Sequence, residues 1–130
     1  MRMIVKGKYE QNGAGHFSKH RQNFYAEVER RTGIRLHQGT LNIRCELEVF
    51  SSIPEPTLRI DGVDEIDKNA NQDLLIGPCS IKGIQGYRIL PVIRPNTKAG
   101  HDGRNIIEIS LAEELPGLND GDELEVSFPD

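Results

Sequence analysis

The segment GTLNI, residues 39–43, places two short oxygen-bearing side chains at the start of an alternating stretch. Side chains of a β-strand alternate between its two faces, so Thr40 and Asn42 would point the same way. A hydroxyl oxygen and an amide oxygen would then converge. This spacing predicts a small oxygen site for a hard cation or a phosphate, although a turn followed by a polar strand face would explain the same residues.

A glycine loop precedes this segment. In QNGAGH, Gly13 and Gly15 are one residue apart, between an expected strand and an expected helix. Glycines there let backbone N–H groups approach a phosphate, and the helix start adds a favourable partial charge. His16, at the mouth of the loop, could help to hold the phosphate or could be a solvated surface residue. The loop is not a Walker loop, because no Gly-Lys-Ser/Thr follows, nor a dinucleotide fingerprint, because it lacks the third glycine and the βαβ context.

Glu108 lies inside the apolar segment NIIEIS, where an acidic residue needs a partner or a chemical role. It could orient or deprotonate a substrate hydroxyl, or be the outward residue of an alternating strand. His16 and His20 are four apart but lack the third ligand of an H-E-x-x-H site, so zinc is not indicated. No nucleophile–base pair of the hydrolase type is evident, and Ser18 and Ser110 are interpreted as helix caps.

The length of 130 residues predicts one domain, residues 1–130, with a real core. The net charge of -4 argues against a general nucleic-acid binder. Residues 1–50 carry nine Lys/Arg and five Asp/Glu, whereas residues 51–130 carry seven and fifteen. The basic first part could attract a small polyphosphate, and scattered surface charge explains it as well.

The N-terminal residues MRMIVKGKYE lack the long apolar stretch of a signal peptide, and no apolar run reaches membrane-spanning length. We therefore expect a cytoplasmic protein with no membrane partner. Cys45 and Cys79 have no metal-type spacing and are expected to be buried thiols in a reducing compartment, with a disulfide as the alternative. The sequence indicates no oligomeric state.

Hydrophobic periodicity predicts several short strands. They cover residues 3–9, 41–49, 57–60, 74–83, 87–94, 106–110 and 119–128, the last beginning with a tight turn. Residues 61–73 are interpreted as an acidic, polar surface stretch, and residues 95–105 as a long polar loop of the kind that carries function. Pro78 and Pro91 predict edges, bends or bulges in their strands.

One helix is expected within residues 16–33, with Phe24 and Val28 on its buried face and Glu27 paired with Arg31. Gly33 suits its end. A single helical turn is expected at the segment SLAEEL, where Ser110 and Glu113 offer a capping box. Six or seven short strands with these two helical pieces predict a mainly β fold, a compact barrel with peripheral short helices.

In this order, the segments NGAGHF, GTLNI, IIEIS and LNDGDELEV resemble the archaeal CTP-dependent riboflavin kinase family. The resemblance runs from about residue 4 to residue 128, and Gly39-Thr40-Leu41-Asn42 is its most specific element. It implies a six-stranded cradle-loop barrel. It also implies transfer of the γ-phosphoryl group of CTP to the 5′-hydroxyl of riboflavin, giving FMN and CDP.

The resemblance also implies roles for individual residues. Mg²⁺ would be held by Thr40 and Asn42, the nucleotide by the loop residues Asn12, Gly13, Ala14, Gly15 and His16, and the flavin by Thr97 and Glu108. Glu108 could also orient the attacking hydroxyl, the catalytic role we expect for it. The implied partners are small molecules, riboflavin and a nucleotide.

Several positions depart from the pattern of the family. Its loop usually reads Gly-x-Gly-x-Gly-x-Tyr, often with a glutamate before the third glycine; here Gln11, Ala14 and Phe17 stand at the first glycine, the glutamate and the tyrosine. The usual Lys-Leu-Arg-Glu near the nucleotide base is not recognisable in SLAEEL. Three alternatives stay open: a kinase of this fold with another alcohol acceptor, a non-catalytic flavin- or nucleotide-binding module, and, least favoured, a DNA-binding regulator.

Overall fold

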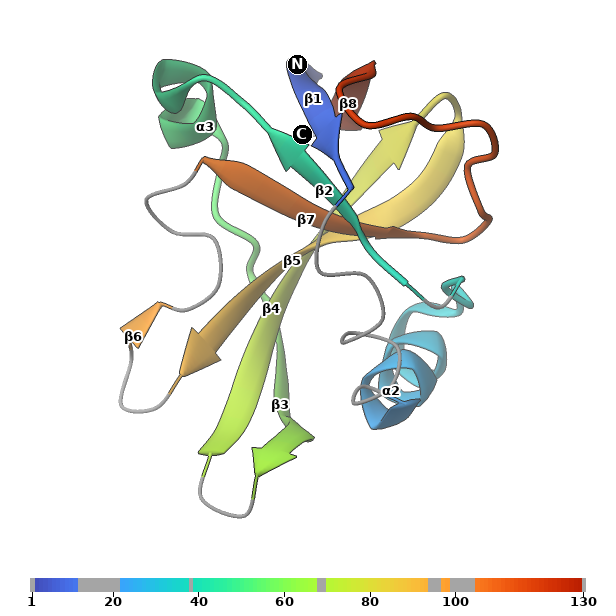
Figure 1. The fold of residues 1–130 in the computed structure, drawn as a ribbon. Helices are drawn as coiled ribbons and strands as arrows, with labels where there is room; N and C mark the ends of the chain where they lie inside the picture. The colour runs from blue at the N-terminus through green and yellow to red at the C-terminus, as the bar shows by residue number, and fades with distance from the viewer. Residues whose placement is uncertain are drawn as a thin grey trace.

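The structure is a computed structural model that describes residues 2–11, 22–37, 39–67, 70–93, 97–98 and 105–129. In this part the chain forms eight strands and two short helices (Figure 1). The strands are β1 (Met3–Glu10), β2 (Leu41–Arg44), β3 (Leu58–Asp67), β4 (Ala70–Ile81), β5 (Ile84–Ile93), β6 (Thr97–Lys98), β7 (Ile106–Leu111) and β8 (Glu123–Phe128). The helices are α2 (Gln22–Thr32) and α3 (Leu47–Ser52).

Six of the described strands close into an antiparallel barrel. Their order is β4-β8-β1-β2-β7-β5, and pairing of β4 with β5 completes the ring. The long strand β3 adds to β4, and the two-residue strand β6 adds to β5, outside this ring. The expectation of a mainly β barrel with peripheral short helices is confirmed. The longest described helix, α2, has eleven residues, and no helix in this part of the chain could cross a membrane.

The β4–β5 hairpin turns at Lys82 and Gly83, which both have positive φ, 51° and 79°. Two successive residues of this kind match the twist of the strands that they connect. Pro78 lies between the part of β4 that pairs with β3 and the residue that pairs with β8. Pro91 lies between the parts of β5 that pair with β7 and with β6. Each proline therefore lies near a change of partner strand, and both belong to the continuous pairing of β4 with β5.

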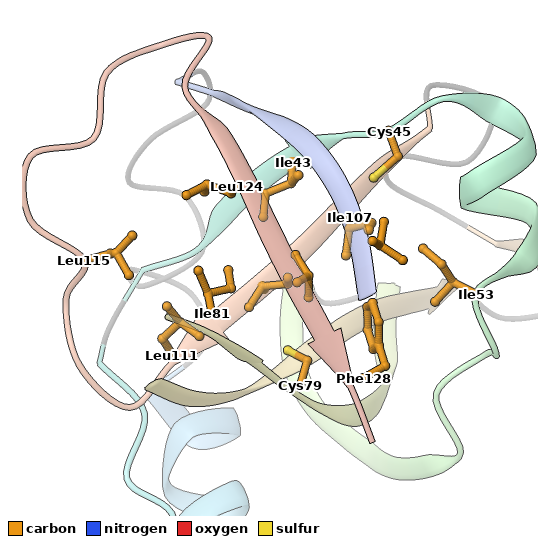
Figure 2. Packing of buried hydrophobic residues seen from close by; sticks show 13 residues of the cluster. Ile43, Cys45, Ile53, Cys79, Ile81, Ile107, Leu111, Leu115, Leu124 and Phe128 are labelled. Atoms are coloured by element: carbon orange, nitrogen blue, oxygen red, sulfur yellow. The ribbon is translucent and has the colours of Figure 1, made fainter. Parts of the chain in front are cut away.

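Apolar side chains form two separate clusters. The interior cluster fills the barrel, and Figure 2 shows its side chains pointing toward one another. Its members include Val5, Ile43, Cys45, Cys79, Ile81, Ile107, Ile109, Leu111, Leu124, Val126 and Phe128. The outer cluster joins α2 to strands β3, β4 and β5. Its members are Phe24, Tyr25, Val28, Leu36, Ile60, Leu74, Ile76 and Ile89.

Helix α2 confirms the expected helix and its buried face. Phe24 and Val28 are both fully buried. The helix ends before Gly33, which has φ +77° and whose N–H donates to the Glu29 carbonyl oxygen at 2.8 Å. A glycine in this left-handed conformation is a common helix terminator. The expected cap, Ser18, lies outside the described residues.

The expected strand over residues 41–49 is wrong beyond Arg44, where β2 ends and the chain turns into α3. Leu47, which an alternating strand would bury, is 61% exposed. The adjacent residues Val49 and Phe50 both pack against the interior cluster, which a helical turn allows and a strand does not. Over so short a stretch, the two-residue and 3.6-residue periods fit the same letters, and packing decides between them.

The expected helical turn in SLAEEL is also wrong. Ser110 belongs to β7 and is fully buried. Its hydroxyl donates to the carbonyl oxygens of Gly39 at 3.1 Å and of His37 at 3.2 Å, a bifurcated hydrogen bond. Residues 112–115 form bends and irregular chain without a helix. The Ser110 hydroxyl therefore does not cap a helix, because the tertiary structure brings two distant carbonyl oxygens close enough to accept its hydrogen bond.

One smaller expectation is also wrong. Glu27 pairs with Arg30 and not with Arg31, whose Nη1 donates to the carbonyl oxygen of Arg59 at 2.9 Å. The described residues of the acidic, polar stretch 61–73 all belong to β3 and β4. The pairing of these two strands shifts register twice, which is typical of β-bulges.

Candidate functional site

One row of polar side chains crosses three strands on the outside of the barrel. Asn42 of β2 pairs with Glu10 of β1 on one side and with Glu108 of β7 on the other. Directly paired residues of antiparallel strands share a face, with Cβ atoms about 5 Å apart. Ile43 and Ile107, the sequence neighbours of Asn42 and Glu108, belong to the interior cluster. The row therefore faces away from the interior cluster, on the outside of the barrel.

The donor set of this row suits a hard cation. The amide oxygen of Asn42 is buried and accepts no hydrogen bond from the described residues, while Asn42 as a residue takes part in other polar interactions. Amide, hydroxyl and carboxylate oxygens are the ligands that Mg²⁺ and Ca²⁺ prefer. Within the described residues, no three His, Cys, Asp or Glu side chains come together as a metal site.

Arg44 balances the charge at one end of the row. Its guanidinium contacts the Glu10 carboxylate at two points, Nε to Oε2 at 2.5 Å and Nη2 to Oε1 at 3.2 Å. Hydrogen bonding to Glu10 raises the pKa of Arg44, so the arginine stays cationic. Such a two-point pair fixes the orientation of both groups. The carboxylate of Glu108 occupies the other end of the row, two residues before Ser110 on the same strand.

Thr40 precedes β2 directly, and both peptide groups of its neighbour Gly39 are held by buried side chains. The Gly39 N–H donates to the hydroxyl oxygen of Tyr25, in α2, at 2.8 Å. The Gly39 carbonyl oxygen accepts from Ser110, in β7. Gly39 itself has φ +122°, a conformation that favours glycine. The backbone at Thr40 is therefore fixed by groups from two distant elements.

A cavity of about 300 Å³ opens beside Thr40. It lies between the start of β2 and the segment that follows β7, and its lining includes Tyr9, His37, Thr40, Leu41, Ile109 and residues 113–118. Thr40 lines this cavity, whereas Asn42 lies in the outer row. The two expected metal ligands are thus two positions apart on one segment, with Thr40 beside the cavity and Asn42 in the row that contains Glu108.

The segment after β7 makes the cavity acidic. Glu113 and Glu114 both line it and are exposed, and its described lining contains neither lysine nor arginine. Carboxylates accept hydrogen bonds and donate none when ionised. This wall of the cavity therefore suits a ligand edge that carries N–H groups.

The remaining expected positions lie elsewhere or beyond the described chain. The loop residues Asn12, Gly13, Ala14, Gly15 and His16 lie outside the described residues. The two ends of that loop are described, β1 at Glu10 and α2 at Gln22. Thr97 forms the short strand β6, where it pairs with Ile93 of β5, and β6 pairs with no other described strand. The backbone thus does not place Thr97 in the row with Asn42 and Glu108.

The two cysteines are free and buried, as the sequence predicts. Burial raises the pKa of Cys45 to about 11 and that of Cys79 to about 12. A thiol reacts as its thiolate, which these values make scarce near neutral pH. Neither cysteine is therefore suited to nucleophilic chemistry in the folded protein.

The sequence-based interpretation missed Tyr25, Glu10 and the true role of Ser110. Tyr25 directly follows the buried Phe24, and a tyrosine buried in a helix needs a partner for its hydroxyl. The sequence pattern therefore indicates that the Tyr25 hydroxyl makes a hydrogen bond, but it does not identify the partner group. Glu10 ends an expected strand, and only strand pairing shows that it lies beside Asn42.

A scan against protein-family models finds no match to this chain, and a search of curated proteins finds none either. The chemistry of the site is therefore the ground for a functional proposal.

Proposed function

We propose that the protein is a Mg²⁺-dependent phosphotransferase of riboflavin kinase type, which transfers the γ-phosphoryl group of CTP to riboflavin. The observation that carries this proposal is the direct pairing of Asn42 with Glu108. It sets an expected metal ligand beside the carboxylate expected to orient the accepting hydroxyl. Such a pair of neighbours is what a phosphoryl-transfer site needs, because catalysis there is mainly positioning and charge stabilisation.

Thr40 and Asn42 would hold the ion. Mg²⁺ in nucleotide sites commonly keeps one or two protein ligands and takes the rest from phosphates and water. When bound, Mg²⁺ would neutralise the charge that develops on the transferred phosphoryl group. Two neutral protein oxygens leave that negative charge to the nucleotide, so ion and nucleotide would bind together.

Glu108 would accept a hydrogen bond from the 5′-hydroxyl of riboflavin and so aim its oxygen at the γ-phosphorus. That oxygen forms the new P–O bond, while the bond from the γ-phosphorus to the bridging oxygen breaks. CDP would leave with the electron pair of the broken bond, and Glu108 would take the hydroxyl proton. The products are FMN and CDP.

The acidic wall of the cavity supports CTP over UTP as the donor. Carboxylates accept hydrogen bonds from the N4 amino group of cytosine, whereas uracil presents the O4 oxygen at the same position. Glu113 and Glu114 would repel that oxygen. The cavity also borders Thr40, so a base bound there could direct its phosphates toward the ion.

The test is a turnover assay with riboflavin, Mg²⁺ and each of CTP, ATP, GTP and UTP in turn, with the flavins separated by chromatography. We expect FMN with CTP and at least tenfold less with UTP, the discrimination typical of one misplaced base contact. Thr40→Ala should lower the CTP rate by at least tenfold, because a metal ligand is lost.

Absence of FMN with all four nucleotides would contradict the proposal. Full activity and unchanged riboflavin affinity in Glu108→Gln would contradict the role given to that carboxylate alone.

The second candidate is a non-catalytic flavin- or nucleotide-binding module. The changes at Gln11, Ala14 and Phe17 in the glycine loop favour it, because they alter the segment expected to hold the phosphates. In the same assay, such a module would quench riboflavin fluorescence without producing FMN.

A further inference from the structure

We infer that Tyr25 and Ser110 are positioning residues of the metal site, which set the place of Thr40 by holding both peptide groups of Gly39. This inference rests on the proposed function, since it concerns the ion that Thr40 would bind. Neither side chain is expected to touch the ion or the substrates.

Tyr25 supplies the first contact. Its side chain is 7% exposed and belongs to the outer cluster, with its ring edge-on to Phe24 at a centroid distance of 5.7 Å. The ring is therefore fixed by packing, and its hydroxyl meets the Gly39 N–H at 2.8 Å. A rigid aromatic side chain holds such a contact at little conformational cost.

Ser110 supplies the second contact from the opposite side. Its side chain is fully buried, and its Oγ lies 3.1 Å from the Gly39 carbonyl oxygen and 3.2 Å from that of His37. The His37 N–H in turn donates to the Leu111 carbonyl oxygen at 2.7 Å. The backbone before Thr40 is thus joined to the end of β7, the strand that also carries Glu108.

Gly39 makes this double contact possible. Its φ of +122° turns the N–H toward α2 and the carbonyl toward β7, and residues with a Cβ rarely adopt that angle. A Cβ placed on Gly39 would meet no atom within 4 Å. Substitution by alanine would therefore disturb the backbone angle without a steric clash.

The contacts have a functional consequence. Helix α2 follows the glycine loop, so Tyr25 connects the element that begins at that loop to the peptide next to Thr40. Partners that orient a metal ligand typically contribute 10–100-fold to metal affinity. Loss of either hydroxyl should accordingly weaken the binding of the ion without removing one of its ligands.

The test is calorimetric titration of CTP into the intact protein with and without Mg²⁺, in the absence of riboflavin. The readout is the dissociation constant of CTP without Mg²⁺ divided by that with Mg²⁺. This ratio reports how much the ion strengthens CTP binding. Tyr25→Phe keeps the packed ring and should lower this ratio by about tenfold or more. The matched control is Tyr87→Phe, because Tyr87 packs against the same cluster and does not line the cavity beside Thr40. It should leave the ratio unchanged.

Ser110→Ala should lower the ratio similarly, and Ser110→Thr, which keeps a hydroxyl on the strand, should retain most of it. Ser127→Ala, a half-buried serine in β8, is the control. Gly39→Ala should act in the same direction.

A lowered melting temperature with an unchanged ratio in Tyr25→Phe and Ser110→Ala would overturn the inference and leave the proposed function standing. Equal loss in Ser110→Thr and Ser110→Ala would overturn the role of the serine hydroxyl. No Mg²⁺-dependent CTP binding in the unmodified protein would overturn both the inference and the metal site that it serves.

Discussion

The interior cluster and the outer cluster contain similar apolar side chains but join different parts of the chain. The interior cluster takes residues from β1, β2, β4, β7 and β8, and so ties the closed ring together. The outer cluster takes Phe24, Tyr25 and Val28 from α2 and packs them on β3, β4 and β5. One cluster makes the barrel, and the other attaches to it the helix that follows the glycine loop.

This difference separates stability from the proposed chemistry. The polar row lies on strands that the interior cluster holds, and Thr40 directly precedes one of them, so the expected metal ligands belong to the barrel framework. The Tyr25 contact to Gly39 depends on the outer cluster instead. Damage to the two clusters should therefore have different effects on binding, even where the loss of stability is similar.

The largest effects are expected from truncation in each cluster. Phe24→Ala should lower the free energy of unfolding by about 3–5 kcal/mol, and Ile81→Ala, in β4, by about 2–5 kcal/mol, because both residues are fully buried. Among molecules that remain folded, Phe24→Ala should also weaken Mg²⁺-dependent CTP binding, whereas Ile81→Ala should not. Urea unfolding and calorimetric titration below the unfolding transition measure the two quantities.

Equal loss of CTP binding in both variants would break the comparison, since it would mean that the site depends on both clusters alike.

An effect of intermediate size on the free energy of unfolding is expected at alkaline pH, and it arises from a buried thiol of the interior cluster. Burial raises the pKa of Cys79 from an ordinary 9.0 to about 12. Above about pH 9 the unfolded chain loses this proton while the folded protein keeps it. The contribution of this thiol to the free energy of unfolding is therefore fully present below about pH 9. It is lost as the pH rises, by about 1.4 kcal/mol per pH unit for each such thiol. Urea unfolding of the unmodified protein and of Cys79→Ala at pH 8, 9, 10 and 11 measures the difference.

Cys79→Ala should show a shallower decline than the unmodified protein between pH 9 and 11. Parallel declines would show that this thiol is not protected by the interior cluster.

The smallest effect is expected at Leu47, which lies on α3 outside both clusters and is 61% exposed. Leu47→Gln should change the free energy of unfolding by less than about 0.5 kcal/mol. Val49→Gln, on the side of α3 that packs against the interior cluster, is the matched comparison and should cost clearly more. Thermal unfolding measures both. A large loss in Leu47→Gln would favour an alternating strand at this position.

Particular elements show how far the sequence could be interpreted alone. The final strand after the Asp120-Gly121 turn and the buried face of α2 follow from local patterns, and both are confirmed. The segment after Arg44 alternates as a strand does, yet it folds as α3, because Val49 and Phe50 find the interior cluster together. Ser110 carries a local capping signal, yet its hydroxyl binds carbonyl groups some seventy positions earlier in the chain.

The sequence by itself determined the mainly β barrel, the helix after the glycine loop and the two cysteines as buried thiols, because periodicity and turn residues act locally. It also determined which oxygens, those of Thr40 and Asn42, are candidates for an ion. Only the tertiary structure decided that Asn42 lies between Glu10 and Glu108, and that Tyr25 and Ser110 hold Gly39. Strand register and the packing of α2 bring these groups together, and both depend on contacts between segments that are far apart in the chain.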